Sequence, residues 1–280
     1  MTLIQAIVIA ILQGATELFP VSSLGHAVIV PALLGWVVDP SGDMFLPFLV
    51  MLHLGTAIAL LVFFWKDWAA IVRGISGRDG SQRQAESIHI VALLVVATIP
   101  AVIIGFLLEH WLRTLFGTAR FAAIFLFLNG LLLLLTERIK ARQSMTEGGA
   151  IASLTYADAA IIGLWQCAAF FPGISRSGAT IIGGLFRNLN HEGAARFSFL
   201  MAQPVIFAAT VREAMHLRHV AVPQGQMQLA AIGAVVAAIT ALASTAFLMR
   251  YFHNHEKWAL SPFAYYCLAV GAACFFYLGR

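Results

Sequence analysis

Charged side chains are scarce in this sequence of 280 residues: Asp, Glu, Lys and Arg together make up 11% of it, and 60% of it is hydrophobic. Soluble domains carry about 25% charged residues. With a mean hydropathy of +0.86, a chain of this size could not shield its apolar side chains from water, which excludes a soluble globular protein. The composition instead predicts an all-α integral membrane protein, because helices satisfy their own backbone hydrogen bonds in lipid.

Cysteine is also rare, with Cys167, Cys267 and Cys274 all in apolar stretches. None has a partner at metal-ligand spacing, so we interpret them as small buried hydrophobic residues. The formal net charge of +4 could suggest a nucleic-acid partner. However, the basic residues lie between apolar segments rather than along one face, so no nucleic acid is expected.

Long apolar runs dominate the remainder. A helix needs roughly 17 to 25 apolar residues to cross a bilayer, and about six transmembrane helices are predicted. They run from Leu46 to Trp65, Ile90 to Leu108, Phe121 to Thr136, Phe197 to Met215, Leu229 to Met249 and Leu260 to Leu278. Two further runs, Thr2 to Phe19 and Ala157 to Phe171, break at Pro/Gly/Ser loops and resume for about ten residues, too few to span. They predict two re-entrant helical hairpins.

Basic residues mark one side of the membrane. They cluster at 66–83, 138–142 and 250–257, and the positive-inside rule places these loops inside. The hairpins would then enter from opposite faces. Their loops are self-similar, with Gln13 to Gly25 matching Gln166 to Gly178. We therefore predict one membrane domain, 1–280, built as an inverted-topology repeat: a first half, 1–140, with hairpin loop 20–26, and a second half, 150–280, with hairpin loop 172–180.

Glu17 is the acidic residue most deeply embedded in apolar sequence, one helical turn after Gln13. A carboxylate at membrane depth is a functional candidate by default, although it could simply pair with a buried cation. Asp158 lies at a helix start and is interpreted as a cap or first-turn anion. His53 lies near a predicted span end and is interpreted as an interfacial or packing residue.

Polar residues gather in the first loop, where Ser22, Ser23 and His26 follow Pro20. Hydroxyls and backbone N–H groups at a helix start can bind an anion, but two serines there could equally be an N-cap. His26 adds a group that titrates near neutral pH and could move a proton.

The second loop contains the stronger signal, because Ser175, Arg176, Ser177 and Thr180 lie within six positions. The guanidinium fork fits two phosphate oxygens, and an unpaired one at membrane depth would be costly. Either Glu17 or an anionic ligand must neutralise it. Together the loops suit phosphoryl transfer, which depends on positioning and charge stabilisation.

These residues resemble a known family across nearly the whole chain. The motifs that carry the resemblance are Gln13-Gly-Ala-Thr-Glu17, Pro20-Val-Ser-Ser-Leu-Gly-His26 and Pro172-Gly-Ile-Ser-Arg-Ser-Gly-Ala-Thr180. They are similar to those of the bacterial undecaprenyl-diphosphate phosphatases, also described as bacitracin-resistance proteins.

The resemblance implies hydrolysis of a C55 polyprenyl diphosphate in the bacterial inner membrane, aided by a divalent cation, Mg or Ca, with the active site facing the periplasm. It implies Glu17 as catalytic carboxylate and metal ligand, with Ser23 or His26 as nucleophile or proton carrier. Arg176 would act with them, and the diphosphate-binding set would be Gln13, Ser22, Ser175, Ser177 and Thr180. Many family members have a second Glu where this chain has Gln13, which puts the coordination of the cation in question.

Other hypotheses stay open at this stage. Inverted repeats with broken helices are also a carrier architecture, so the chain could flip polyprenyl phosphate. A third hypothesis is a non-catalytic envelope subunit. Besides the lipid substrate and the bilayer, a homodimer is a further expected partner. The sequence does not choose among serine, histidine and water as the attacking group.

Overall fold

The protein is helical throughout the part that the computed structural model describes, which comprises residues 1–36, 45–115, 118–142, 149–217 and 224–279. The α-helices are α1 (Leu3–Thr16), α2 (Ser23–Leu33), α3 (Phe45–Phe63), α4 (Trp65–Ile75), α5 (Ser81–Leu115), α6 (Ala119–Arg142), α7 (Tyr156–Gln166), α8 (Arg176–Phe186), α9 (His191–Leu217), α10 (Gln224–Asn254) and α11 (Ser261–Tyr277). The prediction of an all-α protein is confirmed.

Four of these helices are long and apolar enough to cross a membrane: α5, α6, α9 and α10. Helices α3 and α4 meet at a bend of 67° and count as a fifth span if taken together. Helix α11, the remaining expected span, has 17 residues. Five of the six predicted apolar runs coincide with one helix each, α5, α6, α9, α10 and α11 with its caps, whereas the run from Leu46 to Trp65 covers α3 and crosses the bend into α4. The protein is a multi-pass membrane protein with four or five spans by length among its described residues.

The first hairpin is α1, a short loop and α2. Thr2 opens α1 with a capping box, in which its hydroxyl accepts from the Gln5 N–H and the Gln5 side chain accepts from the Thr2 N–H. Ser22 has a φ of 68°, in the left-handed region that few non-glycine residues adopt. Its hydroxyl accepts from the Gly25 N–H and so caps α2. The chain therefore turns at Ser22 and restarts a helix directly.

The second hairpin repeats this plan with α7 and α8. Thr155 and Asp158 form the capping box of α7, which confirms the expected helix-start role of Asp158. These hydrogen bonds from Thr155 hold the pKa of the Asp158 carboxyl below its ordinary value. At the break, Gly173 has a φ of 112°, which a residue with a side chain rarely adopts. Ser175 then caps α8 by accepting from the Gly178 N–H.

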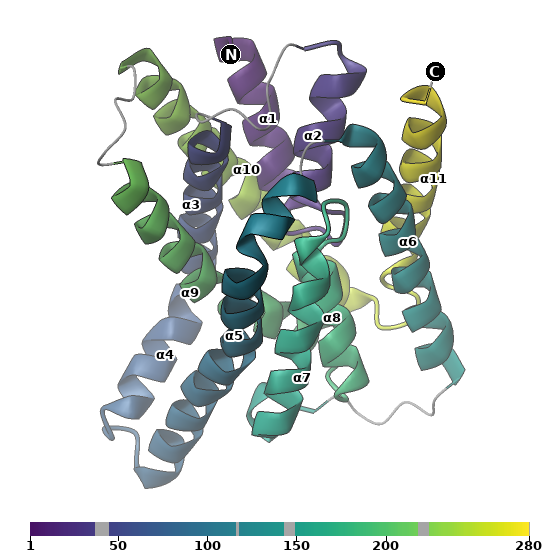
Figure 1. Ribbon diagram of the computed structural model, residues 1–280. Helices are drawn as coiled ribbons and strands as arrows, with labels where there is room; N and C mark the ends of the chain where they lie inside the picture. The colour runs from purple at the N-terminus through teal and green to yellow at the C-terminus, as the bar shows by residue number, and fades with distance from the viewer. Residues whose placement is uncertain (37–44, 116–117, 143–148, 218–223, 280) are drawn as a thin grey trace.

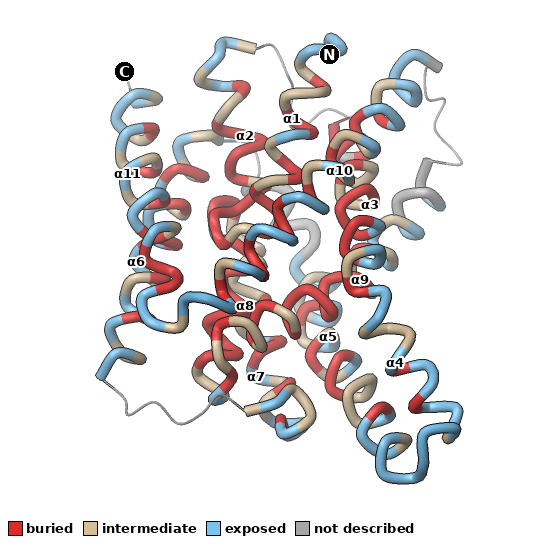
Figure 2. The backbone as a smooth tube through the Cα atoms, turned by 180° about the vertical axis from the view of Figure 1, so that it is seen from behind, coloured by how far each residue is buried: buried red, intermediate tan, exposed pale blue. Residues whose placement is uncertain are grey.

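The two hairpins enter from opposite ends of the molecule (Figure 1). Helices α1 and α2 run inward from the end that holds both chain termini, whereas α7 and α8 run inward from the other end. Their loops meet at mid-depth, which Figure 2 shows as the buried centre of the molecule. Re-entrant backbone is tolerated at this depth only where protein surrounds it.

Each hairpin packs closely on a long helix of the other half of the chain. A methyl group on Gly14 of α1 would lie 2.5 Å from the Ala237 carbonyl oxygen of α10, and one on Gly163 of α7 would lie 2.2 Å from the Ala97 carbonyl oxygen of α5. Small residues permit such approach between helices in a membrane. This reciprocal packing is the pattern that an inverted repeat predicts, and the repeat itself stays a prediction.

Candidate active site

The carboxylate of Glu17 and the guanidinium of Arg176 form an ion pair between the two hairpins. Glu17 follows the last residue of α1 and Arg176 is the first residue of α8. Arg176 Nη2 donates to Glu17 Oε1 at 2.9 Å. The two side chains are 6% and 17% exposed. The expectation that the two loops meet face to face, with these residues in contact, is confirmed.

The other carboxylate oxygen, Glu17 Oε2, accepts from both neighbours on its own hairpin. The Ser23 hydroxyl donates to it at 2.6 Å and Gln13 Nε2 donates at 3.1 Å. The short bond from Ser23 is of the kind that an ionised acceptor gives. The hydroxyl hydrogen of Ser23 is therefore aimed at a base, which is the geometry of an activated nucleophile.

Two buried polar atoms at this ion pair have no hydrogen-bond partner in the described structure. They are Arg176 Nη1, a donor, and Gln13 Oε1, an acceptor. Buried polar groups are almost always paired, so an unpaired one calls for an explanation. A phosphate oxygen would satisfy the Arg176 donor, and a hydroxyl group or water of the reaction would satisfy the Gln13 acceptor.

His53 also contacts Glu17, and the interpretation of this histidine as an interfacial or packing residue is wrong. Its Nε2 lies 3.4 Å from Glu17 Oε2, and its side chain is 29% exposed. It is carried by α3, which belongs to neither hairpin. The site therefore draws on a third element, which the loop motifs did not reveal.

His26 lies beside this cluster and is bonded on both ring nitrogens. Nδ1 faces the Ser22 carbonyl oxygen at 2.6 Å, and Nε2 faces the Tyr266 hydroxyl at 2.9 Å. The carbonyl can only accept, so Nδ1 carries a hydrogen and Nε2 accepts from the phenol. Tyr266 of α11 is a second residue that the sequence did not single out. The Ser22 carbonyl fixes the tautomer of His26, and the Tyr266 hydroxyl is the partner of the other ring nitrogen.

The hydroxyls of Ser175 and Ser177, expected to hold the diphosphate, join the two loops in this structure. Both donate to the Phe19 carbonyl oxygen, at 3.4 and 3.1 Å. Thr180 is bonded to the Arg176 carbonyl oxygen and the Ser198 hydroxyl. All three are buried. Their hydroxyls hold Arg176 in register with the first loop, and their contact with a ligand stays a prediction.

Asn129 of α6 clamps the two loops from the side. Its Nδ2 donates to the Pro20 carbonyl oxygen at 2.9 Å, and its Oδ1 accepts from the Ser175 N–H at 3.0 Å. The loops approach so closely that a methyl group on Gly25 would lie 3.0 Å from the Gly173 Cα. The single amide of Asn129 thus satisfies backbone groups of both breaks, and the one other contact of these two groups among the described residues is the weak Cys267 thiol donor at 4.0 Å from the Pro20 carbonyl oxygen.

A cation held by the protein alone does not fit these residues. Among the described residues, no group of three His, Cys, Asp or Glu side chains is placed to hold a metal ion. Both oxygens of Glu17 already accept hydrogen bonds, and Gln13 Oε1 is a buried acceptor without a partner in the described structure. Mg²⁺ and Ca²⁺ require about six or more oxygen ligands. The expected divalent cation stays a prediction, and the chemistry below uses only the chain's own groups.

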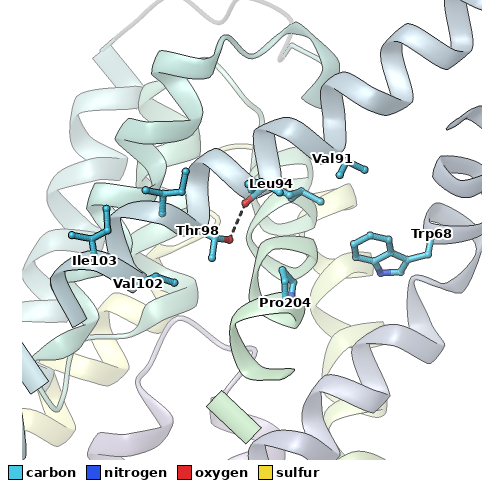
Figure 3. Close-up of a pocket in the computed structure, with 9 residues that line it drawn as sticks. Trp68, Val91, Leu94, Thr98, Val102, Ile103 and Pro204 are labelled. Carbon is cyan, nitrogen blue, oxygen red and sulfur yellow. Dashed lines mark hydrogen bonds between the residues drawn. The ribbon is translucent and has the colours of Figure 1, made fainter. Parts of the chain in front are cut away.

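An apolar groove of about 350 Å³ lies elsewhere, between α4, α5 and α9 (Figure 3). Its lining residues are Trp68, Val91, Leu94, Val95, Thr98, Ile99, Val102, Ile103 and Pro204. The Thr98 hydroxyl donates to the Leu94 carbonyl oxygen at 2.8 Å, the hydrogen bond drawn in Figure 3. None of the lining side chains is ionisable, so the groove offers no group for acid–base chemistry.

Comparison with known proteins agrees with the motifs. Residues 6–273 match the family model described as bacitracin resistance protein BacA. A protein of Gluconacetobacter diazotrophicus named undecaprenyl-diphosphatase is 84% identical over 280 residues, covering 100% of this chain and 98% of its own. One of the same name from Gluconobacter oxydans is 56% identical over 97% of both chains. An undecaprenyl-diphosphatase 2 from Chromobacterium violaceum is 43% identical over 97% of both chains.

Proposed function

The chain belongs to the family of the bacitracin resistance protein BacA, and we propose that the contact between its two loops is the catalytic site of an undecaprenyl-diphosphatase. The protein hydrolyses undecaprenyl diphosphate to undecaprenyl phosphate and inorganic phosphate. This reaction returns the lipid carrier to the synthesis of peptidoglycan and other envelope polymers. The observation that carries the site assignment is the Glu17–Arg176 pair, with Ser23 bonded to the same carboxylate.

Arg176 binds the terminal phosphate in this proposal. One of its terminal nitrogens is paired with Glu17, and the other is buried without a partner among the described residues. A guanidinium can donate from both, so it can hold Glu17 and a phosphate oxygen at once. Its charge stabilises the negative charge that moves onto the leaving group as the anhydride bond breaks.

Ser23 attacks the terminal phosphorus. Its hydroxyl proton passes to Glu17 Oε2 as the new bond forms between Ser23 Oγ and phosphorus. The bond from that phosphorus to the bridging oxygen breaks, and undecaprenyl phosphate leaves with the bridging oxygen and the electron pair. Glu17 passes the serine proton to the departing undecaprenyl phosphate and is a base again. It then takes a proton from the water that attacks the phosphoserine, the bond between Ser23 Oγ and phosphorus breaks, and the same proton moves from Glu17 to Oγ, which releases inorganic phosphate and restores the Ser23 hydroxyl.

His26 is the proton carrier in this proposal. Its Nε2, which faces the Tyr266 hydroxyl, is the ring atom that would take up and release the proton. Direct attack by water, with Ser23 and Glu17 orienting it, is the alternative to a phosphoserine. Both routes use the same base and the same guanidinium.

The membrane setting is also part of the proposal. The basic loops assigned to the inner side and the family resemblance support a bacterial inner membrane protein whose site takes the lipid diphosphate from the periplasmic side. A divalent cation, Mg or Ca, would come with the diphosphate. A homodimer stays a prediction.

The experiment that tests this function is phosphate release by the purified protein in detergent, with C15 and C55 prenyl diphosphates. A phosphatase turns over without a second compartment, whereas a pure flippase of polyprenyl phosphate does not. Turnover that is lost in Glu17→Gln and Arg176→Ala supports the proposed site. No release by the wild type, or full release by both variants, refutes it.

A trap for the phosphoserine separates the two routes. The protein is quenched in acid during turnover of a substrate labelled on the terminal phosphate, and the label is sought on Ser23. Label found in the wild type and absent from Ser23→Ala supports serine attack. Normal phosphate release by Ser23→Ala removes serine from the mechanism and leaves attack by water.

A further inference from the structure

His53 is an ionisable residue in the middle of an apolar helix, and its ring lies between two oxygen atoms. On one side, Nδ1 is 2.8 Å from the carbonyl oxygen of Leu49, one turn earlier in α3. On the other side, Nε2 is 3.4 Å from Glu17 Oε2. A histidine in such a helix carries a desolvation cost. The contact with Glu17 offsets that cost and links α3 to the hairpin site.

The atoms that face the two ring nitrogens of His53 indicate which of these nitrogens carries a hydrogen. The Leu49 carbonyl oxygen can only accept, so Nδ1 carries a hydrogen. The Glu17 carboxylate, paired with Arg176, is a hydrogen-bond acceptor, so a hydrogen on Nε2 would turn the 3.4 Å contact into a donated bond. A ring with hydrogens on both nitrogens would carry a positive charge. His26 differs, because a carbonyl accepts from one of its nitrogens and a phenol donates to the other.

We propose that His53 is a positioning residue of the diphosphatase site, which holds Glu17 turned toward Ser23 and adds a second positive charge beside Arg176. The inference rests on the proposed function of this site and adds α3 to the two hairpins as a source of its groups. In the described structure, the two side chains that can pair with Glu17 as cations are His53 and Arg176.

The geometry gives each cation its own carboxylate oxygen. Arg176 holds Oε1, while His53 approaches Oε2, the atom to which Ser23 donates. With both oxygens held, the carboxylate cannot turn away from the serine hydroxyl. Contacts of this length between catalytic groups commonly shorten when the substrate binds.

The charges also indicate the side from which the diphosphate approaches. Glu17 is nearly buried, whereas His53 is the most exposed of the three charged side chains, at 29%. Two cations face one carboxylate, so the group has a net positive charge. An anionic headgroup entering past His53 would meet this charge before it reaches Arg176.

Two variants separate the positioning effect from the charge. In His53→Leu both the charge and the donor are lost. In His53→Gln an amide N–H can still donate to Glu17, but the charge is lost. The matched control is His89→Leu, since His89 in α5 is also a half-buried histidine bonded to a carbonyl oxygen, that of Leu154, and lies outside the site.

Initial rates of phosphate release from a C15 prenyl diphosphate give kcat and KM for each protein in detergent, with the unfolding temperature measured in parallel. We expect His53→Leu to lower kcat roughly 10- to 100-fold, the loss typical of removing a hydrogen bond to a charged group. His53→Gln should recover most of that kcat but keep a raised KM. His89→Leu should match the wild type in both.

The proposal is overturned if His53→Leu keeps kcat within about threefold of the wild type, or if His53→Gln is no more active than His53→Leu. If His53→Leu does not fold, His53→Gln alone decides, because a wild-type KM in that variant contradicts the charge role. An inactive wild type would instead refute the proposed function, so the two failures are distinguishable.

Discussion

Glu17 and Arg176 stand 159 positions apart in the sequence, and their side chains meet at 2.9 Å between two hairpins that enter from opposite ends of the molecule. The pair uses one oxygen of the carboxylate and one nitrogen of the guanidinium. The other oxygen accepts from Ser23, and the other nitrogen is buried with no partner in the part of the chain that the structure describes. A phosphoryl-transfer site requires a base beside the attacking group and a donor for the phosphate, and Glu17 Oε2 and Arg176 Nη1 are placed to act as these two groups.

The guanidinium of Arg176 should not be replaceable by an amine. Lysine keeps the charge but lacks the planar fork that holds Glu17 and a phosphate oxygen together. We expect Arg176→Lys to lower kcat/KM roughly 100-fold, and Arg176→Ala by about 1,000-fold or more, in the range found for lost transition-state donors. Arg187→Lys, at a half-exposed arginine paired with Asp158, is the control and should keep wild-type kinetics.

The clamp at Asn129 should matter for both stability and activity. Asn129→Leu removes the partner of the buried Ser175 N–H and leaves the Pro20 carbonyl only the weak Cys267 thiol donor at 4.0 Å, and an unsatisfied buried group costs about 1–3 kcal/mol. The unfolding temperature should fall, and phosphate release should fall further than the loss of folded protein explains, because the loops are no longer held in register. Asn254→Leu, at the exposed end of α10, should leave both measurements unchanged. An Asn129→Leu protein with normal activity would show that the loops align without the clamp.

A second buried ionic cluster lies apart from the site and should affect stability alone. His191 Nε2 contacts Glu137 Oε1 at 3.0 Å, and its Nδ1 contacts Glu256 Oε1 at 3.1 Å. Glu137 also accepts from the Leu260 N–H. Removing one partner of a buried pair costs about 3–5 kcal/mol.

The two carboxylates of this cluster differ in exposure, 3% for Glu137 and 35% for Glu256. Glu137→Gln should therefore lower the unfolding temperature more than Glu256→Gln. Phosphate release per folded molecule should stay at the wild-type level in both. A selective loss of kcat in Glu137→Gln would place this cluster in the catalytic machinery and contradict the assignment.

The divalent cation that the family resemblance implies should bind together with the diphosphate. Glu17 is the one carboxylate at the ion pair and both of its oxygens are engaged, so the protein alone offers too few oxygen ligands. A chelator should abolish phosphate release, and Mg²⁺ or Ca²⁺ should restore it. Calorimetry without substrate should detect no saturable cation binding. Tight binding to the free protein would reveal a protein-held site that these residues do not form.

The sequence predicted the Glu17–Arg176 contact because an unpaired guanidinium at membrane depth has few alternatives. The same reasoning predicted the two helix breaks, since Pro20 and Pro172 stand in polar loops between apolar segments too short to span. These inferences depend on the cost of exposing charge or backbone to lipid, and that cost can be read from local sequence.

The roles of His53, Asn129 and Tyr266 were not predicted, because each of these polar residues stands in a largely apolar stretch of a helix and belongs to no motif. The spacing of residues along α3, α6 or α11 does not reveal which neighbouring helix they face. Their roles depend on how the hairpins insert among the spans, which is a property of tertiary packing. An isolated histidine or asparagine in a span is a signal to look for a buried partner, but it does not name that partner.

The most direct test of the central claim is a structure of the protein with a prenyl methylene-diphosphonate, which cannot be hydrolysed at the bridging position. The account predicts the terminal phosphonate within hydrogen-bond distance of Arg176 from the second loop and of Ser23 from the first. A headgroup bound elsewhere, with the Glu17–Arg176 pair unchanged and no ligand atom between the two loops, would contradict it.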